Sequence, residues 1–180
     1  MKQSAIKFSL TLSLNFMLCV NALSHEIQVV TENWPPFNYQ NSQGEIVGSN
    51  TNNVKKILSL SELSHEIKLY PWARTYKLAE SQKNHLIYSL YRTSEREQHF
   101  HWFCPIAPSI KLHLIKLSTS DISISNYTQA KAYKIGVVRK DAPNMYLLSE
   151  GFKPGINLYE TTNENSNIQQ LLNGTVDFIV

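Results

Sequence analysis

The first half of the chain alternates between patterns typical of strands and of helices. Three short runs are rich in β-branched or nearly continuous apolar residues, as strands are; they are residues 26–31, 65–70 and 85–91. Between them, residues 50–60 and 72–83 place apolar side chains at helical spacing. This half therefore predicts the order β-α-β-α-β, with a Pro- and Gly-containing loop after the first strand.

The second half repeats that order after an extended segment, residues 109–117. Residues 121–126 are rich in Ser and Asn and indicate the start of a helix. The patterns that follow predict helices at 127–133, 142–150 and 166–173 and strands at 134–138, 156–160 and 175–180. Strands that alternate with helices predict parallel sheets covered by helices. We therefore expect an α/β protein of two lobes, residues 25–115 and 116–180.

The last predicted strand runs to Val180 without a turn or a polar tail after it. A second lobe of three strands that stopped at this point would be thin. We therefore expect the second lobe to be incomplete and the chain to be a C-terminally truncated form.

The first 24 residues have the pattern of a secretory signal peptide. Lys2 and Lys7 precede an apolar run from Phe8 to Val20, and small residues follow at Ala22 and Ser24. The run is short for a membrane anchor, and polar residues interrupt it. We expect cleavage after Ser24 or after Ala22, and export to the periplasm.

The charge of the exported chain excludes one class of partner. Loss of residues 1–24 removes two lysines and no acid, which leaves 15 basic and 14 acidic residues and a net charge of about +1. This is not the basic surface that nucleic acid requires. Cys104 is then the only cysteine, so no disulfide can form within the chain, and its aromatic neighbours indicate a buried thiol. We expect a soluble monomer.

A cluster of charged residues lies between two apolar runs in residues 87–105. Arg92, Glu95, Arg96 and Glu97 could form an exposed salt-bridge cluster that contributes little stability. Alternatively, one guanidinium could hold the carboxylate of a ligand, because its planar group donates two parallel hydrogen bonds. Arg92 and Arg96 are the two candidates for that role.

The sequence offers little support for catalysis or for a metal site. His99 and His101 would share one face of a strand, but no third ligand stands at a recognisable spacing. The motifs G-x-S-x-G, H-E-x-x-H, C-x-x-C and the Walker loop do not occur. Asp177 is interpreted as an acid at the end of a strand. We therefore expect no enzymatic activity, no cofactor and no metal.

Four segments, in order, resemble the periplasmic solute-binding proteins of family 3, the polar amino-acid binders of bacterial ABC uptake. They are TENWPPFNYQNSQGEIVGSNTNNVKKIL, SLYRTSEREQHFHWFCPI, KIGVVRKDA and LLNGTVDFIV. The variant YPWAR, residues 70–74, is similar to a subgroup whose ligand is unassigned. The resemblance covers residues 26–180 and implies the two-lobed fold of type II periplasmic binding proteins, with the ligand in a cleft between the lobes. In that fold the chain returns to the first lobe, and an acid for the ligand's ammonium often follows the segment that ends here at Val180.

The resemblance also implies which residues reach the cleft. Arg96 stands in the T-x-x-R position and would hold a carboxylate, and Ser89 and Tyr91, at the end of the preceding strand, would add contacts. Trp34 stands in the position of a stacking aromatic residue. Further candidates are Phe37, Trp72 and Glu32. The aromatic residues could instead pack onto their own lobe, and Glu32 could cap a turn. We expect Arg96→Ala to abolish binding and to leave thermal stability nearly unchanged.

The second lobe departs from the family pattern. The family often has a Gly-Thr pair that grips the ligand's carboxylate at a helix N-terminus. This chain has Arg139, Lys140, Asp141 and Ala142 in that stretch. Arg139 could serve an anionic ligand there, or it could face solvent. The expected ligand is an amino acid or a related organic anion.

These observations predict a periplasmic protein that closes its two lobes around a small polar ligand by hinge motion. It would pass the ligand to a membrane ABC permease. The alternatives are the periplasmic ligand-sensing domain of a signalling protein, a binding lobe attached to a secreted hydrolase, and a truncated fragment that binds nothing.

Overall fold

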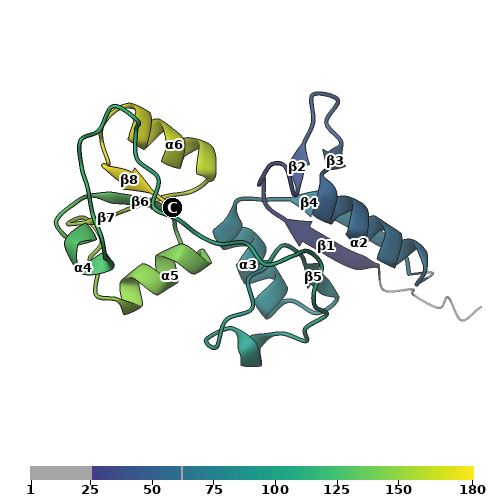
Figure 1. Cartoon of the computed structure of the whole chain (residues 1–180). Coiled ribbons are helices and arrows are strands. Elements are labelled where there is room, and N and C mark those ends of the chain that lie inside the picture. Colours follow the sequence, from purple (N-terminus) through teal and green to yellow (C-terminus); the bar gives the residue numbers. More distant parts are fainter. Residues whose placement is uncertain (1–25, 62) are drawn as a thin grey trace, which may run out of the picture.

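The chain folds into two α/β lobes in a computed structural model that describes residues 26–61 and 63–180 (Figure 1). The elements up to β5 form the first lobe, and the elements from α4 onward form the second. The predicted signal peptide and its cleavage site lie outside the described residues. None of the helices in the described part of the chain is both long and apolar enough to span a membrane.

The first lobe is built on a parallel sheet with the strand order β4-β1-β5. Val29 of the central strand pairs with Ile67 on one side and with Leu86 on the other. Val29 also packs in the core with Val54 and Leu58 of the helix that follows the hairpin. The elements are β1 (Ile27–Thr31), β2 (Tyr39–Gln40), β3 (Ile46–Val47), α2 (Ser49–Ser59), β4 (His65–Leu69), α3 (Trp72–Ser81) and β5 (His85–Ile87).

A short antiparallel hairpin, β2 paired with β3, leads into α2. The side chain of Asn41 closes its turn by accepting hydrogen bonds from the backbone N–H groups of Gln43 and Glu45, at 3.0 and 2.9 Å. The chain then passes through Gly48, whose φ is 122°. A Cβ at this position would overlap the carbonyl oxygen of Phe37, so only glycine allows the helix to start so close to the loop that carries Phe37.

The second lobe repeats the arrangement with the strand order β7-β6-β8. The side chains of β6 alternate between its two faces. Ile135 and Val137 pack with Leu147 of α5, whereas a Cβ on Gly136 would overlap Asn167 of α6 on the other face. The elements are α4 (Tyr127–Ala130), β6 (Ile135–Val138), α5 (Ala142–Ser149), β7 (Leu158–Thr161), α6 (Glu164–Leu172) and β8 (Phe178–Ile179).

Each helix of the second lobe begins with a side-chain cap. An Asn or Asp oxygen accepts a hydrogen bond from the backbone N–H three residues further on, which satisfies a donor that the helix itself cannot pair. The pairs are Asn126 with Gln129, Asp141 with Asn144, and Asn163 with Ser166. The third cap places the start of α6 at Glu164, two residues before the predicted start.

The segment that connects the lobes joins the edge of the second sheet. Ile115 and Ile179 exchange two backbone hydrogen bonds, at 2.8 and 2.9 Å, in an antiparallel bridge. Leu114 and Leu117 on either side pack against two cores of that lobe. The division of the chain at residues 115 and 116 remains a prediction.

The strand predicted at residues 85–91 is shorter in the structure, where β5 ends at Ile87. Ser89 has a φ of 61°, which turns the backbone out of the extended conformation. Its hydroxyl donates to Asn38 Oδ1 and accepts from Asn50 Nδ2. This polar network holds the turn at the carboxyl end of the strand.

The prediction that Cys104 is buried is wrong. Cys104 is exposed, and the neighbouring side chain of Phe103 is 88% exposed. Residues 100–113 form no helix or strand, so no regular element covers them. An apolar run indicates a core position only when the fold supplies a partner for it.

Candidate ligand-binding cleft

A cleft between the two lobes is lined by side chains from both. The first lobe contributes five of the seven ligand-binding residues predicted from the sequence. The second lobe contributes residues that the sequence analysis did not assign to a site. The lining residues are Glu32, Trp34, Trp72, Ser89 and Tyr91 from the first lobe, Asp141, Ala142, Pro143, Glu164 and Val180 from the second, and Leu112 between them.

The lining residues follow the carboxyl ends of parallel strands. Glu32 comes directly after β1, and Ser89 and Tyr91 come after β5. In the second lobe, Asp141 follows β6 and Glu164 follows β7. Open α/β sheets bind ligands at this edge, because neighbouring loops diverge there and leave a crevice. The two sheets thus direct their carboxyl-end loops into one shared space.

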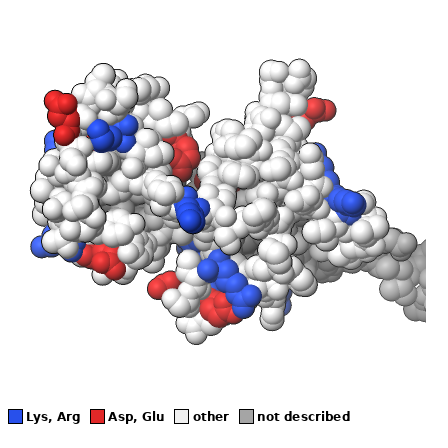
Figure 2. Space-filling view, viewed as in Figure 1, with Lys and Arg blue, Asp and Glu red and all other residues white. Residues whose placement is uncertain are grey.

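Three carboxyl groups face that space, and all three have raised pKa values. Burial, followed by the charges of Glu164 and Asp141, raises the pKa of Glu32 to about 8 against the opposing effect of Arg96. Burial likewise raises the pKa of Asp141 to about 7, and it raises the pKa of Glu164. The space-filling view shows acidic atoms at the gap between the lobes, with basic atoms on the surface beside them (Figure 2). The cleft therefore favours a positive group or protons.

Aromatic rings form one wall of the cleft. The ring of Trp34 packs against Phe37 and Tyr91, with 4.8 and 5.9 Å between ring centroids. Phe37 supports Trp34 and is not among the lining residues. The hydroxyl of Tyr91 is buried and has no hydrogen-bond partner within the described chain. Buried hydroxyl groups are normally paired, so Tyr91 leaves a hydrogen bond for a ligand to complete.

Arg96, the expected carboxylate partner, is buried beside the cleft and is not among its lining residues. Its side chain is only 5% exposed. The guanidinium carbon lies 5.4 Å from the ring centroid of Trp72 and 5.2 Å from that of Tyr76, within the range of cation–π attraction. Burial lowers the pKa of Arg96, and the neighbouring Tyr76 and Asp141 oppose that shift. The ligand contact proposed for Arg96 remains a prediction.

The main-chain carbonyl of Lys140 ties the two lobes together. It accepts hydrogen bonds from Trp72 Nε1, at 2.8 Å, and from Arg96 Nη2, at 3.1 Å. Both donors belong to the first lobe, and Lys140 belongs to the second. Lys140 has a φ of 66°, and its N–H donates to the buried side chain of Asn144 at 2.9 Å. We refer to Trp72, Arg96 and the Lys140 carbonyl as the interlobe bridge.

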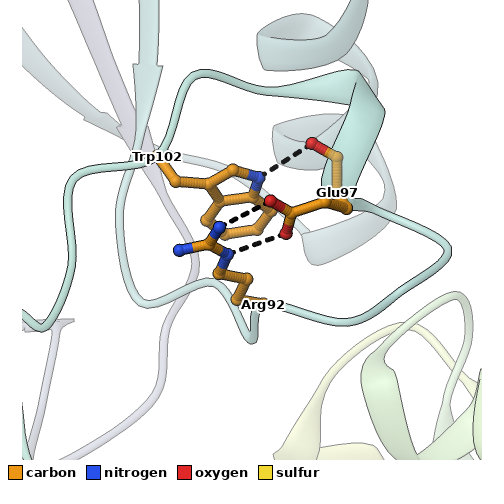
Figure 3. A network of polar contacts seen from close by, with 3 residues as sticks. All are labelled: Arg92, Glu97 and Trp102. Atoms are coloured by element: carbon orange, nitrogen blue, oxygen red, sulfur yellow. Dashed lines mark hydrogen bonds and ion pairs between the residues drawn. The ribbon is translucent and has the colours of Figure 1, made fainter.

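Arg92, the other candidate, lies in an exposed ion pair (Figure 3). Its Nε and Nη2 donate to the two carboxylate oxygens of Glu97 at 2.7 and 2.5 Å. Glu97 in turn accepts a hydrogen bond at its backbone oxygen from Trp102 Nε1, at 3.1 Å. The guanidinium also lies over the Trp102 ring, with 5.7 Å to the centroid. The charge cluster therefore divides into a surface pair at Arg92 and a buried cation at Arg96.

Two acids of the cleft, Asp141 and Glu164, were missed by the sequence analysis. In the sequence, Asp141 belongs to the stretch that departs from the family pattern, and the predicted helix begins two residues after Glu164. Both share one signal with Glu32, because each follows a predicted parallel strand within a few residues. An acid within a few residues after a predicted parallel strand is therefore the sequence signal that all three have in common.

Other residues singled out in the sequence lie away from the cleft. Arg139 is exposed, as one of its two interpretations expected. Asp177 accepts a hydrogen bond from the backbone N–H of Lys134 at 2.8 Å, which fits a strand-end acid. His99 lies 3.2 Å from a carboxylate oxygen of Glu80. Among the described residues, no three His, Cys, Asp or Glu side chains are grouped in a way that could hold a metal ion.

Several solved structures share this architecture. A histidine kinase sensor domain with similarity to periplasmic binding proteins superposes with a TM-score of 0.73 at 16% identity, over 86% of this chain and 67% of that one. A mutant of ArgBP from T. maritima gives a TM-score of 0.72 at 15% identity, over 86% and 66%. ArtJ from Geobacillus stearothermophilus, an arginine-, lysine- and histidine-binding protein, gives 0.69 at 22%, over 86% and 65%. The chain thus spans about two thirds of the length of each.

These likenesses confirm the predicted fold. Because the identities are this low, they support no conclusion beyond the fold. No curated protein matches the chain significantly. The sequence profile of one family does match, over residues 27–153, which is most of the described chain. Together with the two lobes and the cleft between them, this match shows that the chain belongs to the bacterial extracellular solute-binding proteins, family 3.

Proposed function

We propose that the protein is a periplasmic solute-binding protein that captures a small polar ligand in the cleft and delivers it to a membrane ABC permease. The observation that carries the proposal is the convergence on one cleft of carboxyl side chains from both lobes and aromatic side chains from the first. A ligand that touches both lobes binds the closed form better than the open form, and this difference drives hinge closure. The protein would act as a monomer and without a cofactor.

The lining side chains favour a ligand with a positive group. Glu32, Asp141 and Glu164 supply acceptors, and the face of Trp34 attracts cations. In the part of the chain that the structure describes, no Lys, Arg or His lines the cleft. The organic anion that the sequence allowed therefore has no cationic partner in the cleft, and an amine or guanidinium ligand fits better.

A second candidate function is ligand sensing by a signalling protein. It is favoured by the likeness to the histidine kinase sensor domain, whose TM-score is similar to those of the arginine-binding proteins. The cleft would bind its ligand in the same way, and only the recipient of the closed form would differ. Permease genes beside this gene would support uptake. A transmembrane and kinase segment encoded in the same reading frame would support sensing.

A thermal-shift screen of the exported chain tests the binding function. A ligand that binds only the folded state raises Tm, by an amount that grows with ligand concentration over Kd. The library should contain amino acids, amines, small peptides and organic anions. We expect at least one small polar compound to raise Tm, and Trp34→Ala to remove that shift. Trp102→Ala, outside the cleft, is the control and should keep it. If no compound in the library shifts Tm, the protein is not a solute-binding protein for these classes, and the non-binding alternative stands.

A further inference from the structure

We infer that the ligand is an organic cation without a carboxylate, such as an alkylguanidine or an alkyldiamine. The inference rests on the proposed function and adds the chemical class of the solute. A site for a zwitterion needs a partner for the ligand's carboxylate as well as one for its ammonium, and the charges at this cleft do not fit that need. Among the described residues, every charged side chain that lines the cleft is an acid, and the two nearby groups that could hold a carboxylate, Arg96 and the start of α5, already have partners within the chain.

The guanidinium nearest the cleft is used within the protein. Arg96 donates from Nη1 to the carbonyl of Tyr91, at 3.3 Å, and from Nη2 to the carbonyl of Lys140, at 3.1 Å. The rings of Trp72 and Tyr76 lie near the same guanidinium. Only 5% of Arg96 is exposed, so a ligand carboxylate could reach its remaining N–H donors only if the chain that covers them moved. A buried guanidinium that already has carbonyl and aromatic partners offers little to an incoming anion.

The helix N-terminus at the cleft is occupied as well. The first residues of α5, Ala142 and Pro143, line the cleft, where a helix could attract an anion through its free N–H groups. Pro143 has no N–H to offer. The carboxylate of Asp141 accepts the hydrogen bond of Asn144 N, at 2.6 Å. The protein's own acid therefore stands where the carboxylate of a ligand would bind.

The same cleft contains several groups that can bind a cation. Glu32, Asp141 and Glu164 reach it from three different loops and from both lobes. Burial raises the pKa of all three acids; the charges of neighbouring acids add to this at Glu32 and Asp141, where the nearby Arg96 opposes the rise. The aromatic wall supplies cation–π faces, and the unpaired hydroxyl of Tyr91 can accept a hydrogen bond from an N–H donor.

Matched pairs of compounds that differ only in the carboxylate test this inference. Calorimetric titration of the exported chain at pH 8.5 would compare arginine with agmatine, and lysine with cadaverine. We expect at least one decarboxylated compound to bind roughly tenfold or more tightly than its parent amino acid, because the added carboxylate would be desolvated among three acids. An amino acid that binds as tightly as its decarboxylated partner, or more tightly, overturns the inference.

A matched pair of variants shows whether binding uses the cleft. Glu164→Gln removes one lining carboxylate and should weaken agmatine binding roughly tenfold. Glu150→Gln, on an exposed side chain of the same lobe, should leave the affinity unchanged. Equal effects of the two variants would also overturn the inference. If neither decarboxylated compound binds, the inference fails, while a hit of another class in the thermal-shift screen would leave the proposed function standing.

Discussion

At the scale of single residues, Arg92 and Arg96 show how strongly the surroundings change the role of a side chain. The two arginines stand four positions apart, yet their exposure and their partners differ. Arg92 is exposed and paired with Glu97, whereas Arg96 is buried among two rings and two carbonyl groups. The sequence motif favoured Arg96 as a residue that binds ligand without affecting stability. The structure gives Arg96 a structural role, so that part of the expectation is revised.

We expect Arg96→Ala to lower the free energy of unfolding by roughly 2 kcal/mol, because it removes charged hydrogen bonds and packing at a buried position. Arg92→Ala should change stability little, because exposed ion pairs contribute little. Urea denaturation of the two variants beside the wild type measures both effects. If Arg92→Ala lost as much stability as Arg96→Ala, burial would not be the reason for a different contribution of the two arginines to the free energy of unfolding.

Glu32 makes the stability of the unliganded protein depend on pH. Its pKa is raised to about 8 in the folded state from an ordinary value of 4.5, so the folded state holds the proton more tightly than the unfolded state. The free energy of unfolding should therefore fall as pH rises from about 4.5 to about 8. Above about pH 8 Glu32 is ionised in both states, so its unfavourable contribution to the free energy of unfolding no longer changes with pH.

The variant Glu32→Gln should remove part of this dependence. At pH 8.5 we expect its Tm to exceed that of the wild type by roughly 3 °C, and at pH 4.5 we expect the difference to vanish. Thermal unfolding followed by circular dichroism over this pH range measures it, with Glu150→Gln as the exposed control. If the Tm of the wild type and that of Glu32→Gln changed in parallel from pH 5 to pH 8, Glu32 would not have the raised pKa that this prediction requires.

At the scale of elements, the start of α3 meets the turn between β6 and α5 at the interlobe bridge. Trp72 is the first residue of α3, and its ring is buried while its indole N–H reaches the Lys140 carbonyl. Arg96 reaches the same carbonyl from the turn before the 3₁₀ segment at Glu97–His99. Two donors on one acceptor hold the lobes together.

Removing one of these donors should shift the unliganded protein toward a more open form. Trp72→Phe deletes the indole N–H and keeps an aromatic ring, so we expect a larger radius of gyration by small-angle X-ray scattering. The stability cost should be about 1 kcal/mol, since Arg96 still donates to the carbonyl. Trp102→Phe loses an indole hydrogen bond within the first lobe and serves as the control. An unchanged radius in Trp72→Phe would show that the bridge does not set the lobe separation.

At the scale of the whole molecule, ligand capture and proton release should be coupled. Glu32 and Asp141, with pKa values of about 8 and 7, are partly protonated near neutral pH, and Glu164, Tyr91 and Arg96 are the other ionisable groups facing them. A cation that binds among these carboxyl groups must displace their protons. Its affinity should therefore rise with pH until the acids are ionised.

Titration of agmatine in two buffers with different ionisation enthalpies measures the protons released. We expect release near pH 7 that disappears above about pH 9, with the affinity rising roughly tenfold per pH unit for each proton displaced. Binding that is independent of pH between 6 and 9 would show that Glu32 and Asp141 do not contact the cation. The matched compounds described above keep this outcome separate from loss of binding itself.

The order of elements and the candidate wall of the cleft could be predicted from the sequence, because both depend on local information. Periodicity located the strands of the two parallel sheets and the α-helices within a few residues, and Trp34 and Glu32 follow the first strand wherever its sheet lies. The exposure of Phe103 and Cys104 could not be predicted in this way, because burial depends on whether a distant element covers the segment. The end of β5 at Ile87 depended on a network with Asn38 and Asn50, far away along the chain.

By itself, the sequence determined the two α/β units, their resemblance to family 3 and the positions at which strands end. Only the tertiary structure decided what those ends do together. It turned Arg96 inward to the Lys140 carbonyl and brought the carboxyl groups of both lobes into one cleft. The physical reason is that charge and burial depend on neighbours more than a hundred residues apart, such as Glu32 and Glu164.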